Sequence, residues 1–179
     1  EVCDVFWATG ACLVIRAEVF EKEGGFDDDF FAHMEEIDLC WRLKSRGYRI
    51  VCVPQSKVYH VGGGTLHVEH PRKTYLNFRN NLLLLYKNLP QKQLFPVLFL
   101  RFFMDYLAAF QFFVTGKPQN AKAVFKARVD FRKMLSSFKS KRKENLQKTT
   151  QIHVPEIARK SVILNYYLLG RKTYKANSE

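Results

Sequence analysis

Three carboxylates stand close together at the start of a helix-forming segment, namely Glu35, Glu36 and Asp38. A carboxylate in such a place can act as a general base that takes a proton from a hydroxyl group. The positive end of a helix dipole favours the ionised form, which suits a base better than an acid. Aromatic residues in the preceding segment, 26–31, offer faces on which a sugar ring can stack. An ordinary acidic helix cap has the same pattern, so the surrounding sequence must decide between the two.

The elements that must position these carboxylates are short. Residues 2–6 and 11–15 are predicted strands because they are rich in β-branched and aromatic side chains. Residues 17–23 favour a short helix, and residues 35–46 an amphipathic helix whose apolar side chains recur at helical spacing. A further strand is predicted at 48–53. We therefore expect an α/β fold in this part of the chain.

Five segments share their order and spacing with a known family. They read Trp-Ala-Thr-Gly-Ala-Cys-Leu-Val-Ile-Arg at 7–16, Gly-Gly-Phe-Asp-Asp-Asp-Phe-Phe at 24–31, Glu-Glu-Ile-Asp-Leu-Cys-Trp-Arg-Leu at 35–43, Gly-Tyr-Arg-Ile at 47–50 and His-Val-Gly-Gly-Gly-Thr at 60–65. The set closely resembles the second half of the GT-A domain of family 2 inverting glycosyltransferases, above all the branch with rhamnosyl- and galactofuranosyl-type enzymes of bacterial surface polysaccharides. The resemblance implies the C-terminal half of a GT-A, Rossmann-like domain, followed by an α-helical tail.

The resemblance also implies a role for each carboxylate. Sugar transfer from a nucleoside diphosphate sugar needs a base for the acceptor hydroxyl and positive charge for the departing diphosphate. The family usually has Asp at the position of the base, and this chain has Glu36 there. Glu35 competes with it for this role, and Asp38 is expected to orient the acceptor or a neighbouring arginine. His60 matches a metal-binding histidine of the family, which implies Mn²⁺ or Mg²⁺ as cofactor, although a lone histidine after a strand is more often structural.

Five further residues are expected to contact substrates. Gly63, Gly64 and Thr65 belong to a glycine-rich loop whose backbone N–H groups are suited to close over a diphosphate. Trp7 and Gly10 are expected where the donor or acceptor sugar passes, because a tryptophan ring offers an apolar face to a pyranose. A tryptophan in a strand is equally typical of a protein core.

Two other groups of chemically interesting residues are given structural roles. The acidic run 27–29 contains an Asp-x-Asp pattern, but it matches the family segment that shapes the acceptor side, so it is not assigned to a metal. The cysteines lie in apolar runs and form no Cys-x-x-Cys pair: they are Cys3, Cys12, Cys40 and Cys52. We expect buried free thiols at these positions.

The later part of the chain has a different character. Residues 1–70 carry seven Lys and Arg against twelve Asp and Glu, a net charge of −5, whereas residues 71–179 carry 22 against five, a net charge of +17. Opposite signs indicate two tasks, with an acidic site and a basic surface for an anionic partner. Helices are predicted at 72–88, 94–114 and 119–147.

The apolar segment 94–114 is long enough to span a membrane. Arg101 and Asp105 within it make a simple span costly, so an interfacial helix fits better. The basic helix 119–147 would then face anionic lipid headgroups. We expect peripheral membrane contact through residues 94–147, with a soluble helical bundle as the alternative. A nucleic-acid partner is not expected, because the tail carries no recognisable nucleic-acid motif.

Two parts are therefore expected, with residues 1–80 as the acceptor-side part of the GT-A domain and residues 81–179 as a basic, partly amphipathic helical tail. The expected function is inverting transfer of a sugar from a nucleoside diphosphate sugar to a glycan or lipid-linked acceptor in bacterial surface polysaccharide synthesis, at the cytoplasmic face of the inner membrane. The chain starts without Met inside an apolar run, which we interpret as a fragment that lacks the donor-binding half and is inactive alone. A non-catalytic glycan-binding or membrane-tethering module is the alternative.

Overall fold

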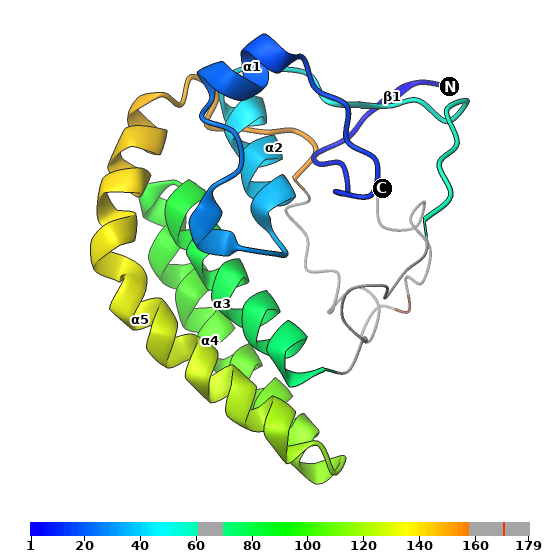
Figure 1. The fold of residues 1–179 in the computed structure, drawn as a ribbon. Helices are drawn as coiled ribbons and strands as arrows, with labels where there is room; N and C mark the ends of the chain where they lie inside the picture. The colour runs from blue at the N-terminus through cyan, green and yellow to red at the C-terminus, as the bar shows by residue number, and fades with distance from the viewer. Residues whose placement is uncertain (61–69, 158–169, 171–179) are drawn as a thin grey trace.

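The computed structural model describes residues 1–60, 70–157 and 170 and shows a helix-rich molecule with a very small sheet (Figure 1). Its elements are β1 (Cys3–Asp4), α1 (Ala17–Lys22), a 3₁₀ turn η1 (Asp28–Phe30), α2 (Glu35–Ser45), β2 (Val51–Cys52), α3 (Pro71–Asn88), α4 (Gln91–Val114) and α5 (Pro118–Gln147). Helices α3, α4 and α5 lie side by side, and α5 curves along the outside of the other two. Helix α2 packs against the C-terminal part of α3.

The helix predictions are confirmed, each to within three residues. Pro71 and Pro118 stand at the first positions of α3 and α5, where the N–H group that proline lacks would have no helical partner. The His70 ring accepts a hydrogen bond from the N–H of Arg72 at 3.1 Å and caps α3. The expected boundary between residues 80 and 81 falls inside α3, so the two expected parts share one continuous helix, and the division into domains stays a prediction.

The strand predictions are largely wrong. Residues 11–15 form no strand, while the strands expected at 2–6 and 48–53 shrink to the two-residue β1 and β2. These two pair antiparallel, in the register Cys3 opposite Cys52 and Asp4 opposite Val51. β-branched and aromatic composition yields a strand only where a neighbouring strand supplies hydrogen bonds, and in the described residues β1 and β2 have only each other. The described part therefore contains no parallel sheet.

The cysteine prediction holds for one of four residues. All four are free thiols, and Cys40 is fully buried on the inner side of α2. Burial raises the pKa of this thiol. Cys3, Cys12 and Cys52 are exposed instead: both residues of β1 and both of β2 are exposed, and Cys12 lies in the turn after Thr9.

The main apolar core lies between α3 and α5. It is closed by one residue from residues 27–34, the acidic loop that precedes α2. Leu82 and Leu83 of α3 and Phe138 of α5 are fully buried, and Phe30 of η1 packs edge-on against Phe138 with ring centroids 6.0 Å apart. A smaller cluster of Ala109, Ala121 and Val124 joins α4 to α5. The acidic N-terminal part and the basic helices therefore share one core.

A buried polar network lies beside this core. The Lys87 ammonium, in a residue only 5% exposed, contacts the carboxylates of Asp27 at 2.7 Å and Asp38 at 2.8 Å. Asp38 also accepts hydrogen bonds from Arg42 at 2.9 Å and from Asn88 at 2.8 Å. Burial alone would raise the pKa of Asp27, but hydrogen bonds from lysines outweigh burial and lower it. One lysine thus ties the start of the acidic loop and the first turn of α2 to α3.

We predict that Lys87→Met lowers the free energy of unfolding by about 3 kcal/mol, because removing one partner of a buried ionic cluster leaves charge uncompensated. The remaining contacts of both carboxylates keep the loss at the lower end of the range for such changes. Lys143→Met, at an exposed position of α5, is the control and should change stability by less than about 0.5 kcal/mol. Urea unfolding followed by circular dichroism measures both, and equal stability of the two variants would contradict the role given to Lys87.

Candidate active site

The loop that leads into α2 has an unusual backbone. Phe31, His33 and Met34 have positive φ angles of 63°, 68° and 78°, and α2 begins directly afterwards at Glu35. L-residues rarely adopt this conformation, which costs on the order of 1–3 kcal/mol at each position and persists only where surrounding contacts impose it. The loop must therefore be held in place by its neighbours.

Asn80 of α3 makes several of the contacts that hold the loop. It is fully buried, and its side-chain amide donates to the carbonyl oxygens of Phe30, Ala32 and His33 at 2.7–2.8 Å. Two N–H groups thus serve three carbonyls, so at least one hydrogen bond is shared. The neighbouring Arg79 donates to the carbonyls of Asp29 and Phe30 at 3.0 and 3.1 Å, and to the side-chain oxygen of Asn80 at 2.8 Å. Neither residue was predicted from the sequence to have a role.

The acidic run 27–29 is tied down by lysines. Lys87 contacts Asp27, and Lys141 of α5 contacts both Asp27 and Asp29, the latter at 2.7 Å. These carboxylates neutralise cations that come from helices far along the chain. The Asp-x-Asp pattern here docks the loop onto α3 and α5.

Glu35 and Glu36 lie in the first turn of α2, both half-buried. One oxygen of each carboxylate, Oε2, is buried and makes no hydrogen bond to the described residues. Burial raises the pKa of Glu35 and is the largest effect; a hydrogen bond from its own backbone N–H opposes it, and the nearby negative charge of Glu36 adds a smaller rise. The positive end of the α2 dipole was expected to keep both carboxylates ionised. At Glu35 the effect of burial on the pKa is larger. A carboxylate with a raised pKa holds a proton more firmly and is the stronger base.

Asp38 has a different place from the other two acids. It is 0% exposed, and its oxygens are occupied by Lys87, Arg42 and Asn88. Arg42 in turn donates to the backbone carbonyls of Glu23 and Gly25, at the turn that follows α1. The structure therefore places Asp38 against a neighbouring arginine, with its carboxylate fully buried.

The segment that carries Trp7 runs along α2. Phe6 packs edge-on against Trp41 with ring centroids 5.4 Å apart, and the backbone of Ala8 hydrogen-bonds the Cys40 sulfur, one turn beyond Glu36. Trp7 itself is 42% exposed, so it is not a core tryptophan. Gly10 is also exposed, and a Cβ there would meet no atom within 4 Å, so packing does not require glycine at this position.

The predicted metal and diphosphate contacts lie at the edge of the described structure or beyond it. His60 is exposed and is the last described residue before a gap. Gly63, Gly64 and Thr65 lie outside the described residues. Within 1–60 and 70–157, no three His, Cys, Asp or Glu side chains come close enough together to hold a metal ion. The described residues therefore do not by themselves fit a Mn²⁺ or Mg²⁺ site.

Comparison with known proteins points to a single family. Residues 3–116 match the family model described as glycosyl transferase family group 2. An N-acetylglucosaminyl-diphospho-decaprenol L-rhamnosyltransferase of Mycobacterium tuberculosis is 43% identical over 56 residues, which cover 31% of this chain and 18% of the relative. Rhamnosyltransferase WbbL of Escherichia coli K12 is 29% identical over 92 residues, 50% of this chain and 33% of the relative. The O-antigen biosynthesis protein RfbC of Myxococcus xanthus is 42% identical over 52 residues, 29% of this chain and 4% of the relative. No solved structure matches the chain.

The environment of Glu35 yields a titration test. We predict that its pKa, followed by ¹³C NMR of the side-chain carboxyl, lies above the usual value of about 4.3 for glutamate. Glu36→Gln should lower the pKa of Glu35, because it removes a neighbouring negative charge. Glu18→Gln, at an exposed position of α1, should leave the pKa of Glu35 unchanged. A pKa at or below the usual value in the unmodified chain would show that the first turn of α2 is not desolvated as described.

Proposed function

The chain belongs to glycosyl transferase family group 2, and we propose that the protein containing it transfers a sugar from a nucleoside diphosphate sugar to a hydroxyl group of a glycan or lipid-linked acceptor, with inversion, in bacterial surface polysaccharide synthesis. The observation that carries the proposal is the pair Glu35 and Glu36 at the start of α2, inside the segment that matches the family. Each has a buried carboxylate oxygen without a hydrogen-bond partner among the described residues, and an exposed tryptophan lies in the segment alongside.

In the proposed reaction, Glu36 takes the proton of the acceptor hydroxyl. The acceptor oxygen attacks the anomeric carbon from the face opposite the nucleoside diphosphate, a C–O bond forms, and the bond to the diphosphate oxygen breaks with its electron pair. Glu35 lies beside Glu36 in the first turn of α2 and is the alternative base. Asp38 acts indirectly, since it fixes α2 through Lys87 and Arg42.

The names of the relatives support a substrate class. Two of them are rhamnosyltransferases, and the mycobacterial name specifies an acceptor built on decaprenyl diphosphate. The matched segments span between 4% and 33% of the three relatives described above, so donor and acceptor remain proposals for this chain. We propose a rhamnose-type donor and a lipid-linked or glycan acceptor.

The proposal also covers fold, cofactor and location. Residues 1–80 are proposed to form the C-terminal half of a GT-A, Rossmann-like domain, followed by the helical tail. His60 is proposed as one ligand of Mn²⁺ or Mg²⁺, and no step above is assigned to the metal, because the described residues offer no complete set of ligands. The proposed location is the cytoplasmic face of the bacterial inner membrane, with peripheral contact through residues 94–147.

We predict that Glu36→Gln in the full-length protein lowers kcat by roughly 10²–10⁴ with little change in donor affinity, as loss of a general base should. The measurement is release of nucleoside diphosphate from a panel of nucleoside diphosphate sugars that includes a rhamnose donor. Glu18→Gln is the matched control and should keep the activity of the unmodified protein.

Two results would change this proposal in different ways. If Glu35→Gln proves more damaging than Glu36→Gln, the two residues exchange roles. If the full-length protein binds glycans but releases no nucleoside diphosphate from any donor, the glycan-binding module becomes the correct interpretation.

A further inference from the structure

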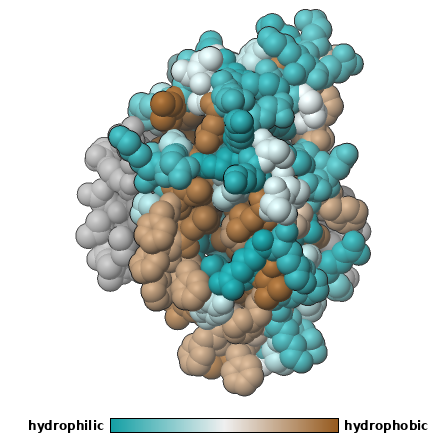
Figure 2. Space-filling view, turned by 90° about the vertical axis from the view of Figure 1, so that its left-hand side faces the viewer, coloured by the Kyte–Doolittle hydropathy of each residue, from teal (hydrophilic) through white to brown (hydrophobic). Residues whose placement is uncertain are grey.

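Helix α4 presents two very different faces. One face packs on α5 through Asp105 and Ala109, which are 0% and 2% exposed. The opposite face is apolar along most of the helix, and the members that are more than half exposed are Phe95, Phe99, Leu100, Phe103, Leu107, Phe110, Phe113 and Val114. Figure 2 shows such apolar rings gathered in the lower part of the molecule, next to hydrophilic side chains. We define these eight residues as the aromatic face of α4.

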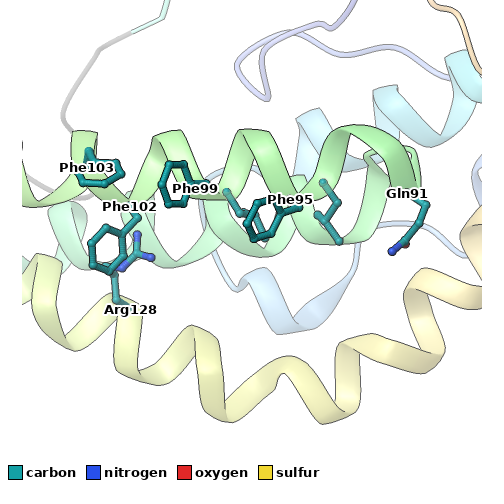
Figure 3. A pocket seen from close by; sticks show the side chains of 8 residues that line it. Gln91, Phe95, Phe99, Phe102, Phe103 and Arg128 are labelled. Carbon is teal, nitrogen blue, oxygen red and sulfur yellow. The ribbon is translucent and has the colours of Figure 1, made fainter.

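The aromatic face is a regular ridge with a hollow beside it. Phe95 stacks on Phe99 with ring centroids 5.9 Å apart, and Phe99 contacts Phe103 at 5.1 Å, so the rings follow one another along the helix (Figure 3). Between this ridge and α5 lies an open, mostly apolar hollow of about 570 Å³, at whose edge Arg128 lies over the Phe102 ring. Flexible apolar chains would fill such an uneven surface more easily than a rigid partner surface would.

The charges of α4 are paired, both within the helix and with α5. Arg101 and Arg128 contact the fully buried Asp105 at 2.7 and 2.6 Å, respectively. These charges therefore belong to the α4–α5 interface and do not point away from it. This pairing offsets part of the cost of Arg101 and Asp105 in hydrocarbon, which the sequence suggested as the obstacle to a span.

The obstacle to a span is α5 instead. Helix α4 has the length and mean hydropathy of a membrane span, and only 11% of its most apolar stretch is buried, unlike the core helix of a soluble protein. It packs along α5, however, so both helices would have to enter the membrane together. Helix α5 exposes the cations Lys122, Lys126, Arg132, Lys133, Lys139 and Lys143. Charged side chains in the hydrocarbon core are costly, which leaves a helix that lies in the plane of the interface.

The edge of α5 next to α4 changes from apolar to basic. Phe125, Val129 and Arg132 follow at helical spacing on one side of α5, and the Phe125 ring contacts Tyr106 of α4 at 5.3 Å. Lys139 and Lys143 continue the same side at spacings of seven and eleven residues from Arg132. An apolar face bordered by exposed cations is complementary to an anionic lipid surface. A second copy of the chain docked on this face would bring like charges together.

We propose that α4 is an in-plane membrane helix, whose aromatic face enters the acyl region of an anionic bilayer while Arg132, Lys139 and Lys143 of α5 meet its headgroups. The salt bridges of Asp105 keep α4 oriented on α5, so that the aromatic face stays outward. This inference rests on the exposure and charge of α4 and α5 and does not depend on the proposed transfer reaction.

The first test is co-sedimentation of the 179-residue chain with phosphatidylglycerol vesicles and with phosphatidylcholine vesicles, at low and high salt. We expect binding to phosphatidylglycerol that weakens with salt but keeps a salt-resistant part. The cations of α5 attract the headgroups electrostatically, whereas the aromatic face binds by apolar contact. Phe99→Glu together with Phe103→Glu should lower binding at least tenfold. Tyr59→Glu, at a residue 96% exposed outside this face, is the matched control and should bind like the unmodified chain.

A charge variant separates the contribution of the cations of α5 from that of the aromatic face. Arg132→Glu with Lys139→Glu should weaken binding to phosphatidylglycerol at low salt and leave the salt-resistant part in place. Far-ultraviolet circular dichroism confirms that each variant is folded. Binding of the Phe99→Glu, Phe103→Glu variant at the level of the unmodified chain would overturn the proposal. The proposal would also be overturned if the chain bound neither kind of vesicle and dimerised through this face, as judged by sedimentation velocity.

Depth measurements decide between a helix in the plane and a helix across the bilayer. Tryptophan is introduced singly at Phe95, Phe103 and Phe113, and the added fluorescence is quenched by lipids brominated at different depths. An in-plane helix predicts the same shallow depth at the three positions. A maximum of depth at Phe103, with both ends shallow, would show a span and overturn the proposal.

Discussion

The ammonium group of Lys87 lies in a largely buried site between two carboxylates that come from different parts of the chain. Asp27 opens the acidic loop and Asp38 lies in the first turn of α2, so one cation fixes both ends of the segment that carries Glu35 and Glu36. A buried charge without partners costs several kcal/mol, which makes this arrangement strongly preferred over one in which the loop moves away. The strained residues before α2 persist because this cluster and Asn80 leave them little freedom.

The basic charge of the helical tail thus has two uses. Lysines that point inward, Lys87 and Lys141, neutralise the acidic loop and hold it against α3 and α5. Cations that point outward, such as Arg132 and Lys139 on α5, remain exposed beside the aromatic face of α4. The opposite net charges of the two parts of the sequence indicated two separate tasks, whereas the structure shows that a share of the positive charge serves the acidic part directly. The acidic loop that leads to the proposed site and the proposed membrane surface therefore both depend on α5.

The sequence was a good guide to local features and a poor one to distant contacts. The helices were found because prolines, glycines and apolar spacing mark them within a few residues. The strand expected at 11–15 was wrong, because strand formation depends on a partner that local composition does not reveal. Asn80 and Lys87 were missed for a related reason, since their partners lie about fifty residues earlier in the chain. The carboxylate cluster was recognised, but the burial that separates Asp38 from Glu35 and Glu36 became visible only in the folded chain.

Asn80 is expected to support catalysis by holding the loop that leads to Glu36. A double-mutant cycle on kcat in the full-length protein tests this directly. Asn80→Asp keeps the volume of the side chain but turns it into an acceptor that faces three carbonyls, so it should release the loop. We expect this change to lower kcat by roughly tenfold or more in the unmodified protein but by less than about threefold in the Glu36→Gln background, because residues that act as a unit are not additive. The same loss in both backgrounds, with the variants folded, would show that Asn80 acts independently of Glu36.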